Sequence, residues 1–128
     1  MAEAVEMAKN YDGMYVAAGI HPSDIDEEIS LEDAVAKLRA LLDKREEYKI
    51  VALGEIGLDY YWKDNAPREF QMEIFRRQLA LAEELGLPVI VHDREAHGDT
   101  MRILWDYPEA RGVIHCFSGT PEMAVEFV

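Results

Sequence analysis

Four side chains able to bind a metal ion stand at or near the ends of short apolar runs. They are His21, Glu55, His92 and His115, which follow the runs MYVAAGI, IVALG, PVIV and GVI. Imidazoles and a carboxylate together form the mixed nitrogen and oxygen ligand set of a catalytic divalent metal. Such an ion lowers the pKa of a bound water to about 7 and supplies a hydroxide nucleophile. These residue types therefore indicate metal-dependent hydrolysis, and a carboxylate can also bridge two ions.

Alternating strands and helices are needed to bring these four residues together. The apolar runs predict strands at Met14–Ile20, from Ile50 to Leu53 or a little beyond, at Pro88–His92 and at Gly112–Phe117. Between them, helical spacing and capping signals predict four helices. One begins after Ser30, a second runs from about Pro67 to Gly86, a third spans Asp99–Trp105, and a fourth opens at Thr120 and Pro121.

Short, continuously apolar strands separated by helices predict a parallel sheet covered by helices. No glycine-rich G-x-G-x-x-G or phosphate-binding loop follows any strand, which disfavours a nucleotide-binding doubly wound fold. The alternative is a TIM (β/α)₈ barrel, which has about 250 residues and its active site at the carboxyl ends of its strands. We therefore predict an α/β fold in which residues 1–128 form one partial barrel domain of about four βα units.

The alternation of side chains along a strand predicts which residues line the interior of this barrel. If His92 points inward, Val89 and Val91 face the helices. Cys116 also faces the helices, so no reactive thiol is expected there. The aliphatic residues expected to share the inner face with the candidate ligands are Val51, Leu53, Ile90 and Val113.

Composition narrows the class of protein further. The net charge is −13, which disfavours a nucleic-acid-binding module that relies on basic patches. It leaves open an enzyme that handles phosphates through a metal and a few arginines. The 1 cysteine, together with the absence of a signal peptide or membrane-length apolar run, predicts a cytoplasmic protein.

Four blocks of the sequence resemble a known family. GIHP, GEIGLDYYW, LPVIVHDREAHGDT and IHCFSGT are similar, in this order, to the signatures of the TatD-type metal-dependent hydrolases. These are amidohydrolase-like (β/α)₈ barrels that include 3′–5′ exonucleases acting on DNA and, in some cases, RNA. The resemblance implies that Glu55, His92 and His115 are metal ligands. It also places His21 near the site and Arg94 beside the metal, where Arg94 could contact a phosphate.

The chain departs from the family pattern in two places. Family members carry a His-x-His pair on the first strand and an aspartate on the last strand, and all three residues bind metal. Neither is found in these 128 residues. The resemblance therefore implies strands three to six of eight, with the domain truncated at both ends and the ligand set incomplete.

Several neighbouring residues have both a functional and an ordinary structural interpretation. Asp59 could hydrogen-bond a ligand histidine, and Arg94 could instead pair with Glu95 or Asp99. The Tyr60–Trp62 segment could stack nucleobases or simply pack its loop against the next helix. His97 is expected to be a polar loop residue.

The sequence thus predicts a metal-dependent hydrolase whose parent enzyme cleaves phosphodiester bonds in single-stranded DNA or RNA, or in small phosphodiesters. One or two divalent ions are expected, with Mg²⁺ favoured and Zn²⁺ or Mn²⁺ as alternatives. No membrane or protein partner is indicated, and no catalytic residue beyond the ligands. Two rival hypotheses stay open: an ester or amide hydrolase of the same superfamily, and a catalytically incomplete fragment without activity.

Overall fold

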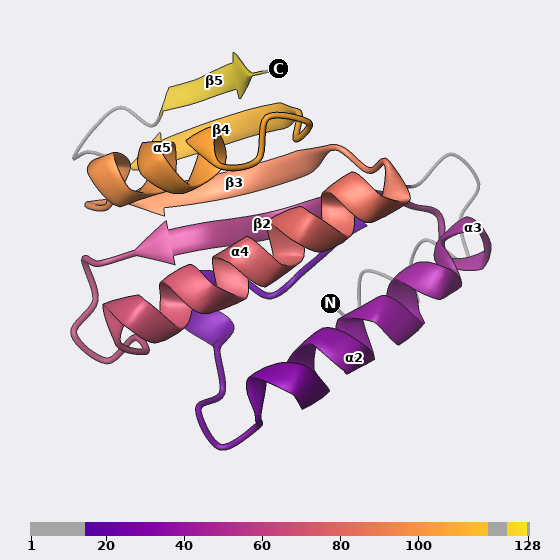
Figure 1. Cartoon of the computed structure of the whole chain (residues 1–128), viewed down its shortest axis with the longest axis horizontal. Coiled ribbons are helices and arrows are strands. Elements are labelled where there is room, and N and C mark those ends of the chain that lie inside the picture. The colour runs from indigo at the N-terminus through magenta and orange to yellow at the C-terminus, as the bar shows by residue number, and fades with distance from the viewer. Residues whose placement is uncertain (1–14, 118–122, 128) are drawn as a thin grey trace.

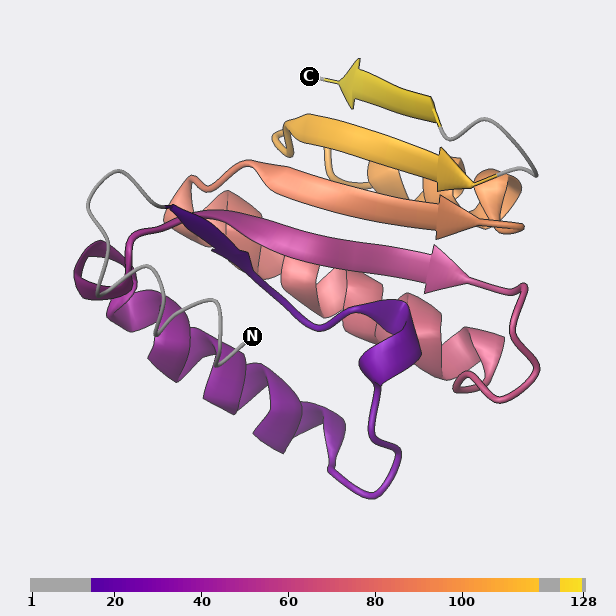
Figure 2. The ribbon, with the colours of Figure 1, turned by 180° about the vertical axis from the view of Figure 1, so that it is seen from behind.

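A five-stranded sheet forms the centre of the computed structural model, which describes residues 15–117 and 123–127 (Figure 1). Its strands lie in chain order: β1 (Val16–Ala18), β2 (Ile50–Asp59), β3 (Val89–Arg94), β4 (Gly112–Phe117) and β5 (Met123–Phe127). The first four are parallel, as the sequence predicted. Their carboxyl ends therefore meet at one edge, where Figure 2 shows the arrowheads of β2, β3 and β4 together.

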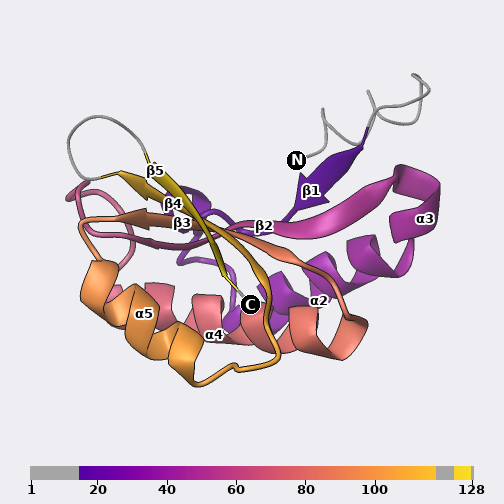
Figure 3. The same cartoon turned by 90° about the horizontal axis from the view of Figure 1, so that it is seen from above.

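Helices follow each of the first three strands. They are the short 3₁₀ turn η1 (Pro22–Asp24), α2 (Leu31–Asp43), α3 (Arg45–Tyr48), α4 (Arg68–Leu85) and α5 (His97–Trp105). Of these, α2, α4 and α5 lie on one side of the sheet (Figure 3). The predicted caps are present: the Ser30 side chain accepts a hydrogen bond from the Asp33 amide at 3.1 Å. Gly86 ends α4 with a φ of 67°. The alternation of strands and helices confirms the predicted α/β class.

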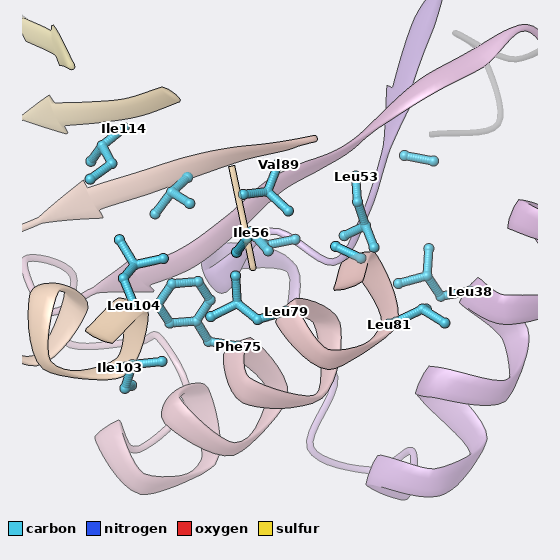
Figure 4. Close-up of a cluster of buried hydrophobic side chains, with 14 of the residues drawn as sticks. Leu38, Leu53, Ile56, Phe75, Leu79, Leu81, Val89, Ile103, Leu104 and Ile114 are labelled. Carbon is cyan, nitrogen blue, oxygen red and sulfur yellow. The ribbon is translucent and has the colours of Figure 1, made fainter. Parts of the chain in front are cut away.

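The hydrophobic core lies between the sheet and α4 (Figure 4). Phe75 and Leu79 on α4 are fully buried, and they meet strand residues that include Ile56, Val89 and Val91. Burial of Val89 and Val91 on this side confirms the predicted alternation along β3. Each large apolar side chain buried here contributes about 1.5–3 kcal/mol of hydrophobic stabilisation, and α2 and α5 add Leu38 and Ile103 to the same core.

Strand β2 is longer than predicted and contains an irregularity. It continues to Asp59, and its pairing with β3 shifts between Gly54 and Ile56, so that Glu55 is the extra residue. An extra residue reverses the alternation on either side of it. Leu53 pairs with Val89 and joins the buried core, so the prediction that it shares a face with Glu55 is wrong.

The segment near the carboxyl end also differs from prediction. A helix was expected to open at Thr120 and Pro121, which lie outside the described residues, whereas Met123–Phe127 form strand β5 antiparallel to β4. The free edge of β4 offers unpaired amide and carbonyl groups to any neighbouring extended segment. This edge pairing, which local sequence spacing does not encode, overrides the helical pattern.

None of the helices in the described part of the chain is long and apolar enough to cross a membrane.

Gly57 provides a test of how closely β2 and β3 are packed. Its φ is 137°, and an added Cβ would lie 2.1 Å from the carbonyl oxygen of His92. Gly57→Ala should lower the free energy of unfolding by about 3 kcal/mol or more, because it combines backbone strain with a backbone clash. Chemical denaturation measures this loss.

Gly98→Ala is the matched control, since nothing lies within 4 Å of its added Cβ and the residue is within α5. It should leave stability unchanged or raise it by up to about 1 kcal/mol. Equal stabilities for the two variants would contradict the close approach of β2 and β3.

Candidate metal centre

Three imidazoles surround the carboxylate of Glu55. One carboxylate oxygen, Oε1, lies 3.6 Å from His21 Nε2 and 3.6 Å from His92 Nδ1. The other oxygen, Oε2, lies 3.4 Å from His115 Nδ1. The four residues that the sequence singled out are therefore brought together, with the three histidines around the carboxylate of the fourth, Glu55.

The parallel strands put these side chains at one level of the sheet. Gly57, His92 and His115 are register partners on β2, β3 and β4, and Glu55 bulges from β2 beside them. His21 lies beyond the end of β1, where it caps η1. Strands β2 and β3 continue beyond the residues at which they were predicted to end, to Asp59 and Arg94, whereas β4 has the predicted bounds Gly112–Phe117.

His92 is oriented by a buried carboxylate. Its Nε2 lies 2.9 Å from Asp59 Oδ2, and the two side chains are only 7% and 2% exposed. A carboxylate accepts a hydrogen bond, so in the neutral ring Nε2 carries the proton and Nδ1 presents a lone pair. That lone pair is on the nitrogen facing Glu55, in the carboxylate–histidine arrangement that is typical of metal sites.

His21 has the opposite proton arrangement. Its Nδ1 accepts a hydrogen bond from the Ser23 amide at 3.0 Å, so in the neutral ring the proton is on Nε2. Burial lowers the pKa of His21 below its usual value, and the neighbouring His92 lowers it further. His21 therefore presents an N–H donor toward Glu55, rather than a lone pair.

The spacing of the donor atoms fits a metal ion. Nitrogen and oxygen ligands of a tetrahedral Zn²⁺ lie about 3.4 Å from one another, given bonds of about 2.1 Å. Ligand atoms of His21, Glu55 and His92 all lie within 4.8 Å of one another and could hold an ion. Within that group, the positions of the ring protons favour His92 over His21 as a metal ligand. His115 faces the second oxygen of the Glu55 carboxylate.

Two buried glutamines on α4 hold the segments that carry the site. Gln71 accepts a hydrogen bond from the Asp59 amide at 2.9 Å and donates to its carbonyl at 3.1 Å. Gln78 binds the amide and carbonyl of Ile20 in the same way, at 2.7 and 3.2 Å. One helix thus positions both Asp59 and the residue that precedes His21.

Sequence reasoning missed both glutamines. They are seven residues apart, two helical turns, and therefore lie on the same face as Phe75 and Leu79. An amide on an apolar helix face needs a buried polar partner, and this was the signal available in the sequence.

The remaining predicted residues lie around this centre. The Arg94 guanidinium stands 3.9 Å from the centre of the Tyr61 ring, while the Tyr60 hydroxyl donates to Asp99 at 2.8 Å. Burial raises the pKa of Tyr60, and the bond to Asp99 adds to that effect. His97 is at the start of α5, where its exposed ring meets Asp93 at 3.1 Å.

Comparison with known proteins places this geometry in a family. The family model described as TatD related DNase matches residues 1–128. An uncharacterized metal-dependent hydrolase, YabD of Bacillus subtilis, is 41% identical, and the match covers 98% of this chain and 48% of the relative. The 3′-5′ ssDNA/RNA exonuclease TatD of Cronobacter sakazakii is 39% identical over 97% of this chain and 46% of its own length.

Solved structures agree with the sequence relatives. The crystal structure of YjjV from Escherichia coli, a TatD homologue, superposes with a TM-score of 0.77 at 38% identity, covering 94% of this chain and 45% of that one. A TatD-family hydrolase from Entamoeba histolytica gives 0.74 at 30% identity, covering 93% and 40%. The chain spans about half the length of the curated relatives it matches.

Asp59→Asn tests the orientation of His92. The amide keeps the shape of the side chain but removes the negative charge that holds the proton on His92 Nε2. Affinity for Zn²⁺ or Mn²⁺, measured by calorimetry, should fall by about 10- to 100-fold. Asp64, an exposed acid in the loop that follows β2, is the control, and Asp64→Asn should leave the affinity unchanged. Equal affinities for both variants would contradict the role of Asp59.

Gln78→Leu tests the positioning of His21. The leucine leaves the Ile20 amide and carbonyl without their partner, which should lower the free energy of unfolding by about 1–3 kcal/mol. The NMR signals of the His21 ring should shift as its segment moves. Ala80→Leu, an exposed position on the same helix, should change neither quantity. An unchanged His21 signal in Gln78→Leu would show that other contacts position this ring.

Proposed function

Because the chain belongs to the TatD-related DNase family, we propose that its protein hydrolyses phosphodiester bonds in single-stranded DNA or RNA, from the 3′ end, with a divalent metal. Its relatives are metal-dependent hydrolases, and some of them are named 3′-5′ ssDNA/RNA exonucleases. The same chemistry is proposed for small phosphodiesters that fit the site.

The observation that carries this proposal is the Glu55 carboxylate with imidazole nitrogens at both of its oxygens. Glu55, His92 and His115 are the proposed ligands. Because His92 faces Oε1 and His115 faces Oε2, this carboxylate would be able to hold one ion or two. Residues Glu55, His92 and His115 would hold such an ion, which would supply a hydroxide nucleophile at neutral pH. Mg²⁺ is our first choice, and the imidazoles also suit Zn²⁺ or Mn²⁺.

The surrounding side chains have distinct proposed roles. His21 directs its Nε2 proton toward the ligand cluster, where it can donate to a phosphate oxygen or to a water. Asp59 holds His92 in the tautomer that offers Nδ1. Arg94 lies two residues beyond His92 on β3, on the same face, where its charge can offset that of a phosphate.

We further propose that residues 1–128 form one part of a larger (β/α)₈ barrel domain. The support is the match of four parallel βα units to TatD-family structures of which this chain covers 40–45%. Activity is accordingly proposed for the whole protein.

Glu55→Gln is the direct test of the nuclease proposal. The amide is a poor metal ligand and cannot bridge two ions, so nucleotide release from single-stranded DNA should fall at least 100-fold, to about the level seen after chelation by EDTA. Glu47→Gln is the control: Glu47 is exposed on α3, before the amino end of β2, and the change should leave the rate unaltered.

The same assay on small carboxylic esters separates the main rival reaction. Metal-dependent hydrolysis of an ester, without nucleotide release from DNA or RNA, would replace the nuclease proposal by an esterase. Absence of both activities in the whole protein would reject the nuclease proposal and the esterase alternative.

A further inference from the structure

Two large aromatic side chains are exposed in the loop that follows β2. Tyr61 is 50% exposed and Trp62 is 54% exposed. Their rings meet edge to face, with centroids 4.7 Å apart and planes at 87°. Exposed pairs of this size often mark a binding surface. Tyr61 and Trp62, together with Arg94, are called the aromatic platform below.

Arg94 connects this platform to the metal centre. Its guanidinium carbon lies 3.9 Å from the centre of the Tyr61 ring and 5.4 Å from that of Trp62, both within the range of a cation–π contact. Arg94 is on β3, two residues beyond His92. The platform is therefore held from the strand that carries a proposed metal ligand.

The buried carboxylate of Asp59 connects the aromatic platform to His92, a proposed metal ligand. Asp59 Oδ1 accepts a hydrogen bond from the Tyr61 amide at 3.0 Å, while Oδ2 meets His92 Nε2 at 2.9 Å. The Asn65 side chain adds a hydrogen bond to the Asp59 carbonyl at 3.2 Å. The row of Asp59 and Arg94 is two residues beyond the row of Gly57 and His92, or about 7 Å along the strands.

Tyr60, and not Tyr61 or Trp62, packs the loop after β2 against the helices. Tyr60 is partly buried against the core, its hydroxyl bonds Asp99 on α5, and Arg68 of α4 lies over its ring at 4.3 Å. Tyr61 and Trp62 remain about half exposed. The loop is thus anchored to the helices without them, and about half of each side chain is exposed to a ligand although Arg94 lies over both rings.

We propose that the aromatic platform stacks a nucleobase of the single-stranded substrate, next to the phosphodiester bond that is cleaved; this inference rests on the proposed nuclease function. Long-range attraction does not bring nucleic acid to a chain of net charge −13. Affinity then has to come from short-range contacts. Stacking on an aromatic ring supplies such a contact for any base, so the platform predicts binding that needs unpaired bases and tolerates sequence.

The test compares two substrates on the whole protein with its metal. One is a short oligothymidylate, and the other is the same strand with its 3′-terminal nucleotides replaced by abasic sites. Trp62→Ala should raise KM for the first by about 5- to 150-fold and leave KM for the abasic strand unchanged. Trp62→Phe should restore most of the loss, because phenylalanine keeps a stacking face.

Trp105→Ala is the matched control. Trp105 is the most exposed large hydrophobic residue described, at 86%, and lies at the end of α5. Its loss should change KM for neither strand. Equal effects of Trp62→Ala on both strands, or no effect on either, would overturn the inference while leaving the nuclease proposal standing.

A binding measurement decides the case in which no nuclease activity is found. In a Trp105→Phe background, Trp62 is the one tryptophan left among these 128 residues, and a stacked base should quench its fluorescence. The difference in fluorescence between this variant and one that also carries Trp62→Phe gives the emission of Trp62 alone. Quenching by the oligothymidylate, but not by the abasic strand, supports the platform even if the proposed function fails. Equal quenching by both strands, or none, would reject it.

Discussion

The buried carboxylate of Asp59 is the group on which the rest of this site depends. It binds the His92 ring through one oxygen and the Tyr61 amide through the other, while Gln71 satisfies its backbone. A buried carboxylate is stable only when its oxygens are paired. That requirement couples the orientation of a proposed ligand to the position of the loop beyond it, so Asp59 links the candidate metal centre to the aromatic platform.

The two histidines nearest to Glu55 Oε1 divide donor and acceptor roles. Asp59 holds the proton of His92 on Nε2, which points away from Glu55. The Ser23 amide donates to Nδ1 of His21, so the proton of that ring is on Nε2, the nitrogen nearest to Glu55. Their rings lie 4.5 Å apart, yet one presents a lone pair and the other an N–H. A metal-dependent hydrolase needs both kinds of group, since the ion requires lone pairs while a phosphate oxygen requires donors.

An acidic protein can still act on nucleic acid if its contacts are short in range. A net charge of −13 opposes long-range association with a polyanion, but the proposed metal, Arg94 and the two aromatic rings would act on a phosphate and a base at short range. We therefore expect the affinity of the protein for nucleic acid to depend on the metal and on unpaired bases far more than on long-range electrostatic steering.

The sequence by itself determined the α/β class, the four parallel strands, the caps of the helices at Ser30 and Gly86, and the convergence of Glu55, His92 and His115. These follow from local periodicity and from the rule that carboxyl ends of parallel strands share an edge. Only the tertiary structure decided the bulge at Glu55 and the strand at Met123–Phe127. It also decided which ring nitrogen of each histidine carries the proton, and the hydrogen bonds of Gln71 and Gln78 to the backbone of Asp59 and Ile20. Each of these depends on which group lies opposite in another element, and local spacing carries no information about that partner.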